Sequence, residues 1–194
     1  MNTIFKKKIS IAGRAIGSDF PPYVIAEMSA NHNGDIRNAL RIIDAAKLSG
    51  ADAVKIQTYR PDTITLKSNN PEFMINEGLW AGRSLYDLYE EAHLPWEWHG
   101  EIFSYARVVG ITIFSSPFDS TAVDLLEDLN APAYKIASFE MIDLPLIKYA
   151  ASTKKPLIIS TGMANDEEIT EAVDAASSAG CTELVILHCV SGYP

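Results

Sequence analysis

The chain has 194 residues, of which 47% are hydrophobic and 21% are charged, and its formal net charge is −9. This composition is typical of a globular protein with one well-buried core. Because an acidic surface repels phosphate backbones, we do not expect nucleic acid as a partner. An anionic small substrate would have to be bound by a local cluster of lysines or backbone N–H groups.

Three features indicate a cytoplasmic protein that does not contact a membrane. No apolar run reaches the roughly 18 residues that a membrane-spanning helix needs. The start of the chain, MNTIFKKKISIAGR, is basic but lacks the continuous apolar region of a secretory signal. Cys181 and Cys189 are too few for a disulfide framework, which fits a reducing compartment.

Short apolar runs alternate with amphipathic segments along the chain. The runs are apolar on both faces, as strands buried in a parallel sheet are. The predicted strands are 23–28, 53–58, 111–116, 133–138, 156–161 and 184–189. The predicted helices lie at about 35–49, 96–109, 119–129, 143–153 and 166–179, with Asp35, Asp119, Asp143 and Asp166 as N-caps or first-turn acids. This repeat indicates the α/β class.

Two arrangements fit the repeat, an open doubly wound sheet and a TIM (β/α)8 barrel. Polar residues gather at the C-terminal ends of the predicted strands, and in a barrel these ends meet at one mouth. They are Glu27, Lys55, Gln57, Ser115, Ser116, Lys135, Ser138, Glu140, Ser160, Thr161 and His188. We therefore predict the barrel.

A closed (β/α)8 barrel needs two βα units more than the sequence contains, and about 250 residues are typical. We expect a barrel truncated after about six βα units. Residues 1–20 are then a lead-in segment, and 21–194 are the N-terminal part of the barrel. The alternative is a fold that is not a closed barrel. Residues 59–94 form an unusually long connection, which predicts an active-site lid or substrate loop.

Lys55 and Lys135 lie within predicted apolar strands, where a charge is costly unless it meets an anion or lines a polar cavity. The alternative is a lysine that pairs with a carboxylate or reaches solvent. Two such lysines at equivalent strand ends favour an anion site. Glu27 and Glu140 are candidates either for charge partners of these lysines or for groups that bind sugar hydroxyls and move protons.

The histidines are weaker signals. His32 fits an ordinary turn residue, and His188 fits a core or a site residue equally well. His93 and His99 flank a tryptophan-rich run that suits either packing or sugar binding. The sequence has no HxxH, HExxH or CxxC spacing and so no complete metal site. The turn STGM (160–163) is a weak anion-binding signal before a helix.

Six motifs taken together resemble the sialic acid synthase family, the phosphoenolpyruvate-condensing sugar synthases. In chain order they are AEMSANHNG, GADAVKIQTY, SSPFD, PAYKIASFE, LIISTGM and LHCVSGYP. The resemblance extends from about residue 22 to Pro194. Within the family, residues 78–99 are similar to the pseudaminic acid synthase branch, and Met28 and Ser29 point the same way.

The resemblance implies an enzyme of carbohydrate biosynthesis for cell-surface polysaccharide. It would condense phosphoenolpyruvate with open-chain 2,4-diacetamido-2,4,6-trideoxy-altrose and release phosphate by C–O cleavage. Lys55 and Lys135 would bind phosphoenolpyruvate, Glu27 would bind the sugar, and Glu140 would lie near the reacting carbons. Further substrate-binding candidates are Ser116, Ser138, Ser160, His188, Ser191, Tyr193, Asn31 and Gln57.

The chain also departs from the family. The family's metal-binding histidines lie in a Ser–Asp–His and an Arg–His segment on the last two barrel strands, and neither segment occurs here. These ligands are therefore expected beyond Pro194. A divalent metal ion, Mn²⁺ or Mg²⁺, is implied by the resemblance alone. The same holds for a homodimer of the full-length form, in which an antifreeze-like domain caps the partner's site.

Three alternatives remain open at this stage. The first is an N-acetylneuraminate synthase that uses N-acetylmannosamine. The second is a Schiff-base aldolase that uses Lys55 or Lys135. The third is a truncated, non-catalytic fragment that retains only ligand binding, and we expect the 194-residue form alone to lack metal-dependent phosphate release.

Overall fold

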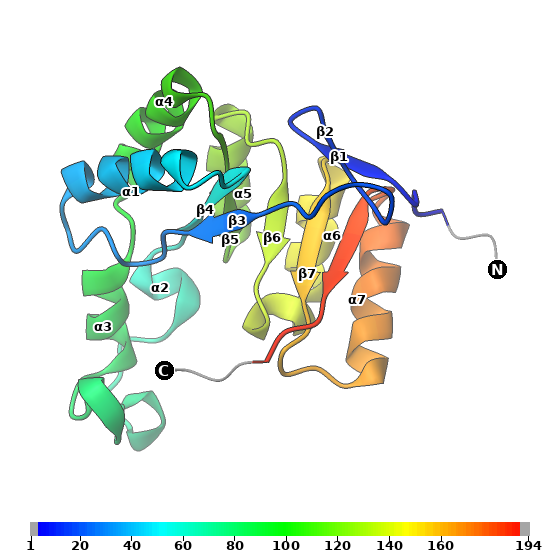
Figure 1. Ribbon diagram of the computed structural model, residues 1–194. Coiled ribbons are helices and arrows are strands. Elements are labelled where there is room, and N and C mark those ends of the chain that lie inside the picture. The colour runs from blue at the N-terminus through cyan, green and yellow to red at the C-terminus, as the bar shows by residue number, and fades with distance from the viewer. Residues whose placement is uncertain (1–3, 191–194) are drawn as a thin grey trace.

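The computed structural model describes residues 4–190. Its centre is a curved, parallel, six-stranded sheet in which each strand pairs with the next one along the chain (Figure 1). The strands are β3 (Ile25–Glu27), β4 (Ala53–Thr58), β5 (Thr112–Pro117), β6 (Tyr134–Ile136), β7 (Leu157–Ser160) and β8 (Leu184–Leu187). A doubly wound sheet would reverse its strand order at a switch point, and this sheet does not. The predicted TIM barrel, truncated after its sixth strand, is therefore confirmed.

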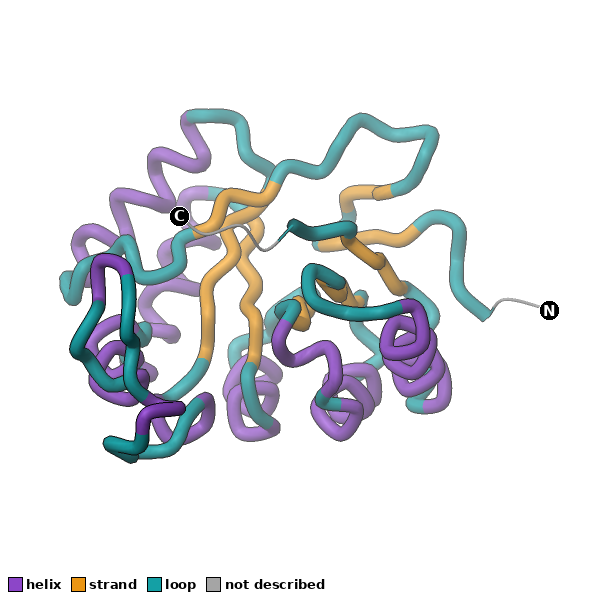
Figure 2. Tube along the Cα trace, turned by 90° about the horizontal axis from the view of Figure 1, so that it is seen from below, coloured by secondary structure: helices purple, strands orange, loops and turns teal. Residues whose placement is uncertain are grey.

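Helices lie outside the curved sheet (Figure 2). They are α1 (Ile36–Leu48), α2 (Pro61–Ile64), α3 (Leu85–Ala92), α4 (His99–Val109), α5 (Ser120–Asp128), α6 (Leu144–Ser152) and α7 (Asp166–Ser178). Asp35, Asp119 and Asp143 accept N-cap hydrogen bonds from backbone amides, and Asp166 is a first-turn acid of α7, whose N-cap is Asn165, so all four predictions are confirmed. Between residues 4 and 190, no helix is both long and apolar enough to cross a membrane.

Each strand contributes alternate side chains to two cores. Val54, Ile56 and Ile113 belong to the core between the sheet and the helices. Ala53, Phe114, Ala133 and Ile158 belong to a second core on the inner face of the sheet, with Ile9 and Ile11 from the N-terminal segment. This division follows from the two-residue period of strands.

A β-hairpin closes the N-terminal end of the sheet. Its strands β1 (Ile9–Ile11) and β2 (Arg14–Ile16) pair antiparallel within the segment expected to be only a lead-in. Arg14 forms an ion pair with Asp52, just before β4. Glu183, just before β8, accepts hydrogen bonds from the Ser10 amide at 3.0 Å and the Lys6 amine at 2.6 Å. The hairpin thus connects opposite sides of the curved sheet.

The connection from β4 to α4 contains α2, α3 and two short 3-10 helices, Pro71–Phe73 and Gly78–Trp80. Figure 1 shows α3 beside the sheet and the rest of the connection extending away from it. Leu79 and Trp80 in this extension are 85% and 50% exposed. The predicted long insert is therefore present, and its role as a lid remains a prediction.

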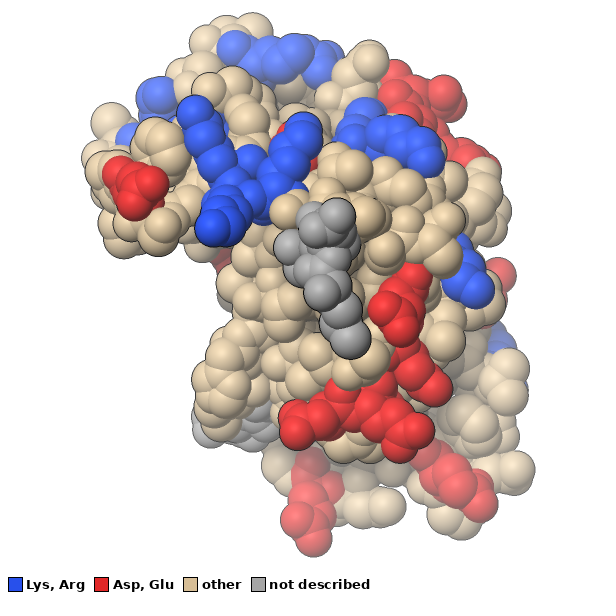
Figure 3. Space-filling view, turned by 90° about the vertical axis from the view of Figure 1, so that its right-hand side faces the viewer, with Lys and Arg blue, Asp and Glu red and all other residues tan. Residues whose placement is uncertain are grey.

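Charge is unevenly distributed over the surface. On the face seen in Figure 3, Lys and Arg gather in one area, and Asp and Glu gather in another. Acidic residues occupy the whole first turn of α7, at Asp166, Glu167 and Glu168. The net charge of −9 therefore does not determine the local potential at any one site.

Phe114 is fully buried in the inner core directly below the barrel mouth. Replacing it with alanine should lower the free energy of unfolding of the natural full-length protein by about 3–5 kcal/mol, because it leaves a cavity that the hairpin cannot fill. Urea denaturation measures this change. Val108, which is 85% exposed on α4, provides the control, since V108A should stay within about 0.5 kcal/mol of the parent protein. Equal losses of unfolding free energy in F114A and V108A would contradict the burial of Phe114 in the inner core.

Candidate functional site

The strand ends bring charged and polar side chains together on the inner face of the barrel mouth. The residues of the inner apolar core include Ile25, Ala53, Phe114, Ala133 and Ile158. Two positions after each of these stand Glu27, Lys55, Ser116, Lys135 and Ser160, respectively. Because strand side chains alternate, these five polar residues face the same interior, one level closer to the mouth.

Lys55 is firmly positioned. Its side chain is 12% exposed and forms an ion pair with Glu27, its direct register partner on β3. Its Nζ atom also donates a hydrogen bond to Ser116 Oγ at 3.3 Å. The Glu27 side chain is 42% exposed, and its Oε1 atom accepts a hydrogen bond from the Ser29 amide at 3.2 Å. Glu27 is thus a charge partner that still has an exposed side to meet a ligand.

Lys135 is the less compensated of the two lysines. Burial lowers the pKa of Lys135 to about 8, and the positive charge of Lys55 also lowers it, against the opposing charges of Glu27, Cys189 and Glu140. Among the described residues, no carboxylate forms an ion pair with Lys135. The interior therefore holds two lysines and one directly paired carboxylate, an arrangement that a bound anion would stabilise.

Glu140 lies beyond β6 in the 3-10 helix Phe139–Ile142. Burial raises the pKa of Glu140, although its own backbone amide and Lys135 act in the opposite direction. Its Oε2 atom is buried and has no hydrogen-bond partner within residues 4–190. Glu140 thus holds a proton to higher pH than an exposed glutamate does, as a proton-transfer group requires.

The serines supply uncharged hydrogen-bonding groups. Ser138 Oγ accepts a hydrogen bond from the Gly162 amide at 3.2 Å, which places the STGM turn beside β6. Ser160 is 4% exposed at the end of β7. Helix α7 begins only at Asp166, and its acidic first turn opposes anion binding. Anion contacts in this turn would have to come from the residues before the helix.

The remaining predicted site residues differ in their placement. Gln57 Oε1 accepts a hydrogen bond from Ser29 Oγ at 3.4 Å on the β3–β4 side of the mouth. Asn31 is exposed, and its side chain donates to the Met28 carbonyl at 3.0 Å, so it stabilises its own loop. His188 is exposed just after β8. Ser191 and Tyr193 lie outside the described residues.

Two buried histidines lie away from the charged interior. His99 Nε2 lies 2.9 Å from Thr58 Oγ1, its Nδ1 lies 3.2 Å from the Pro95 carbonyl, and burial lowers the pKa of His99 to about 4. His32 is 1% exposed, and its ring meets Trp98 edge-on at 5.8 Å. Packing and hydrogen bonds account for His99, whereas His32 packs on Trp98 and its buried Nε2 atom has no hydrogen-bond partner within residues 4–190.

An aromatic cluster at the mouth did not emerge from the sequence. The Tyr59 ring lies 5.8 Å from the Tyr89 ring and 5.3 Å from the Phe118 ring. Tyr59 and Phe118 stand two positions after Gln57 and Ser116, so the strand period offered a signal for them. Tyr89 comes from α3 in the long insert, where no pattern in the sequence locates it.

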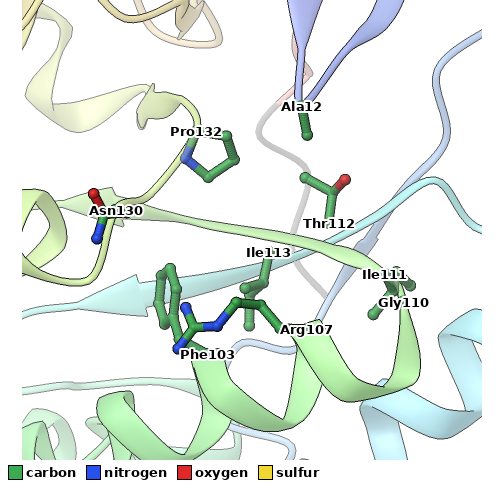
Figure 4. A pocket seen from close by; sticks show the side chains of 9 residues that line it. All are labelled: Ala12, Phe103, Arg107, Gly110, Ile111, Thr112, Ile113, Asn130 and Pro132. Atoms are coloured by element: carbon green, nitrogen blue, oxygen red, sulfur yellow. The ribbon is translucent and has the colours of Figure 1, made fainter.

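A cavity of about 370 Å³ lies at the other end of the strands (Figure 4). It is lined by Ala12, Phe103, Arg107, Gly110, Ile111, Thr112, Ile113, Asn130 and Pro132. Arg107 is the single charged residue in this lining. Because charged groups converge at the mouth instead, the mouth is the candidate site.

The described residues do not fit a resident metal ion. Between residues 4 and 190, no group of three or more His, Cys, Asp or Glu side chains is arranged to hold one. Of the carboxylates at the mouth, Glu27 forms an ion pair with Lys55, and Glu140 has a raised pKa that favours its protonated form. Pro194, beyond which the family's metal ligands are expected, itself lies outside the described residues, so that expectation stays a prediction. No metal is therefore assigned to residues of this chain.

Residues 42–194 match the model of the NeuB family. The chain belongs to the NeuB family. It is 49% identical to the pseudaminic acid synthase of Helicobacter pylori over 90% of this chain and 51% of that protein. It is 48% identical to the pseudaminic acid synthase of Campylobacter jejuni over 91% of this chain and 52% of that protein. The chain thus spans about half the length of the curated relatives it matches.

Other relatives act on related sugars. The chain is 37% identical to the N,N'-diacetyllegionaminic acid synthase of Legionella pneumophila over 92% of this chain and 51% of that protein. In structure, it is similar to the N-acetylneuraminic acid synthetase of Leptospira borgpetersenii, crystallised with citrate, with a TM-score of 0.83. That match has 29% identity and covers 96% of this chain and 60% of the other.

The lowered pKa of Lys135 predicts how anion binding depends on pH. Sulfate keeps its charge near neutral pH, so its affinity reports the protonation of the protein. We expect the dissociation constant to be steady below pH 8 and to rise about tenfold per pH unit above it, as Lys135 loses its proton. Isothermal titration calorimetry measures this profile. K135M should abolish this pH dependence, and the control K148M, a change on α6, should keep it. A dissociation constant that does not change with pH in the parent protein would contradict the role of Lys135 in anion binding.

The raised pKa of Glu140 predicts a pH-dependent stability. A folded-state pKa above the unfolded value gives a favourable contribution at low pH, which is lost as the pH rises through the folded-state pKa. E140Q should therefore match the parent's melting temperature at low pH and exceed it once the pH rises above the folded-state pKa of Glu140. Thermal denaturation across pH tests this, with E101Q at an exposed position of α4 as the control. A difference in melting temperature between E140Q and the parent protein that is the same at all pH values would contradict the raised pKa of Glu140.

Proposed function

We propose that this chain carries the substrate-binding half of a phosphoenolpyruvate-dependent nonulosonate synthase. In this proposal, the favoured sugar is open-chain 2,4-diacetamido-2,4,6-trideoxy-altrose, and the product is pseudaminic acid. N-acetylneuraminate synthesis from N-acetylmannosamine is the nearest alternative. The family membership supports the reaction type, and the two Helicobacter and Campylobacter relatives support the choice of sugar.

One observation carries the proposal. Lys55 and Lys135 face the same interior, and the half-buried Lys135 lacks an ion-pair partner among residues 4–190. Phosphoenolpyruvate carries a carboxylate and a phosphate, so it offers negative charge to both lysines. Ser138 and Ser160 lie on the same side of the mouth, and their hydroxyl groups provide further donors, with Ser138 Oγ held by the hydrogen bond that it accepts from the Gly162 amide.

The reaction requires four changes. A carbon–carbon bond forms between C3 of phosphoenolpyruvate and the aldehyde carbon, and the aldehyde oxygen takes a proton. Water then adds at C2, and the C–O bond to phosphate breaks. In the proposal, Glu140 gives its proton to the aldehyde oxygen and takes a proton back from the water that adds at C2, since burial favours its protonated form. Glu27 accepts hydrogen bonds from sugar hydroxyls through its exposed side.

Two further parts of the proposal rest on the family rather than on residues of this chain. A divalent metal ion would polarise the aldehyde oxygen in the complete site. A homodimer of the full-length form would complete the site at the subunit contact. We derive no step from either, since residues 4–190 offer no metal-binding cluster.

The lowered pKa of Lys135 favours a second candidate, a Schiff-base aldolase. A lysine with a pKa of about 8 is a better nucleophile near neutral pH than an ordinary lysine. Such an enzyme would form a covalent adduct that borohydride traps, with a mass increase at Lys135. A synthase that only binds anions at Lys135 gives no adduct.

Phosphate release decides between these candidates. The natural full-length protein should release phosphate from phosphoenolpyruvate with the 2,4-diacetamido sugar, and K135M should lower kcat/KM at least a hundredfold, because removing a desolvated charge partner costs about 3–5 kcal/mol. Liberated phosphate is measured by a coupled assay, and K148M serves as the matched control on α6. Turnover with N-acetylmannosamine alone would show that this sugar, and not the 2,4-diacetamido sugar, is the substrate. Unchanged turnover in K135M would overturn the proposed role of the mouth.

A further inference from the structure

Three aromatic rings pack against one another at one side of the mouth, where Tyr89 and Phe118 are partly exposed and Tyr59 is buried behind them. Tyr59 follows β4, Phe118 follows β5, and Tyr89 lies in the middle of α3. The Tyr59 ring meets Phe118 at an interplanar angle of 68° and Tyr89 at 82°, both in edge-to-face geometry. We call Tyr59, Tyr89 and Phe118 the aromatic wall.

The strand period places the wall above the charged interior. Tyr59 stands two positions after Gln57 and four after Lys55, and Phe118 stands two positions after Ser116. Gln57 and Ser116 are register partners in the β4–β5 pair, so the two strands present their next inward positions side by side. Two residues correspond to a rise of roughly 6.6 Å along a strand. The wall therefore begins about one side-chain level further out than Gln57 and Ser116.

Electrostatics places Tyr89 near Glu140. Burial raises the pKa of Tyr89, and the negative charge of Glu140 raises it further, so the two groups lie within range of each other's field. Burial likewise raises the pKa of Tyr59. Both tyrosines therefore keep their protons, and the wall presents neutral rings beside the proposed proton-transfer group.

The wall is held from two sides. Trp96 Nε1 donates a hydrogen bond to the Tyr59 carbonyl at 3.1 Å, and the Arg60 guanidinium lies over the Trp96 ring at 3.8 Å. Tyr59 itself is 4% exposed. Tyr89 is carried by α3, whose N-cap Ser84 accepts a hydrogen bond from the Asp87 amide at 3.0 Å. The rings are thus positioned before any ligand arrives.

We propose that the aromatic wall determines which sugars the site accepts, by packing against a terminal methyl group at the end of the sugar remote from the aldehyde. This inference rests on the proposed synthase function. The lysines, carboxylates and serines at the mouth are suited to the charged and hydroxyl-bearing parts of the substrates. A methyl group forms neither hydrogen bonds nor ion pairs with those partners, whereas burial against neutral rings is favourable for it.

The same wall disfavours a terminal hydroxymethyl group. A hydroxyl packed against the ring faces of Phe118 and Tyr89, away from the phenol oxygen, loses its hydrogen bonds to water, and a ring face offers none of equal strength. Apolar pockets of this kind discriminate by about 10- to 200-fold for a difference of one small group. Discrimination of that size is within reach of steady-state kinetics.

The test uses two open-chain 2-acetamido sugars that differ only at their last carbon, one ending in methyl and the other in hydroxymethyl. We measure kcat/KM for both in the natural full-length protein with phosphoenolpyruvate present. The methyl sugar should be preferred at least tenfold. Y89A and F118L should each reduce this preference to about one-third or less of its original value, while KM for phosphoenolpyruvate stays within about twofold.

Two controls separate the wall from general damage. Y89F retains the ring and should keep the preference. Y86A changes another tyrosine of α3, one that packs near Lys67 rather than in the wall, and should also keep it. Equal preference for both sugars in the parent protein, or an unaltered preference in both Y89A and F118L, would overturn the wall's role. An absence of phosphate release with either sugar in the parent protein would instead overturn the proposed synthase function.

Discussion

The alternation of side chains along parallel strands determines where the charged groups of this protein lie. Each inward position is followed, two residues later, by another inward position one level closer to the mouth. On β4, this rule takes the chain from Ala53 in the apolar core to Lys55, then to Gln57 and finally to Tyr59. A shift of one residue in register would point Lys55 into the helix-covered core, where its charge would find no partner.

The N-terminal hairpin holds the strands in place at the end of the sheet opposite the mouth. Its residues Ile9 and Ile11 fill the narrow end of the curved sheet, and two other hairpin residues bind acids there: Arg14 binds Asp52 before β4, and Ser10 binds Glu183 before β8. Those two acids stand at the starts of strands near opposite edges of the sheet. By holding both sides at the N-terminal end, the hairpin limits how far the sheet can flatten. The distances between strand ends at the mouth depend on that curvature.

Patterns that repeat along the strands could be predicted from sequence, and features that depend on the long insert could not. The six strands, the barrel order and the inward lysines follow from period and composition, and the structure has them. The hairpin was missed because its strands have only three residues each, too few to show a period. Tyr89 was missed because its contact with Tyr59 depends on where α3 packs beside the sheet, which no local pattern encodes. Ionisation states also needed the structure, since burial raises the pKa of Glu140 and lowers that of Lys135.

The opposite shifts at Lys135 and Glu140 share one cause, because burial disfavours the charged form of both. Each shift therefore brings the group closer to the pH at which it can exchange a proton. An anion bound between the lysines would stabilise the charged form of Lys135 and so raise its pKa again. The same negative charge would raise the pKa of Glu140 further and keep its proton in place. Binding of the anion would thus act on both groups at once: Lys135 would become a fixed positive charge, and Glu140 would keep its proton.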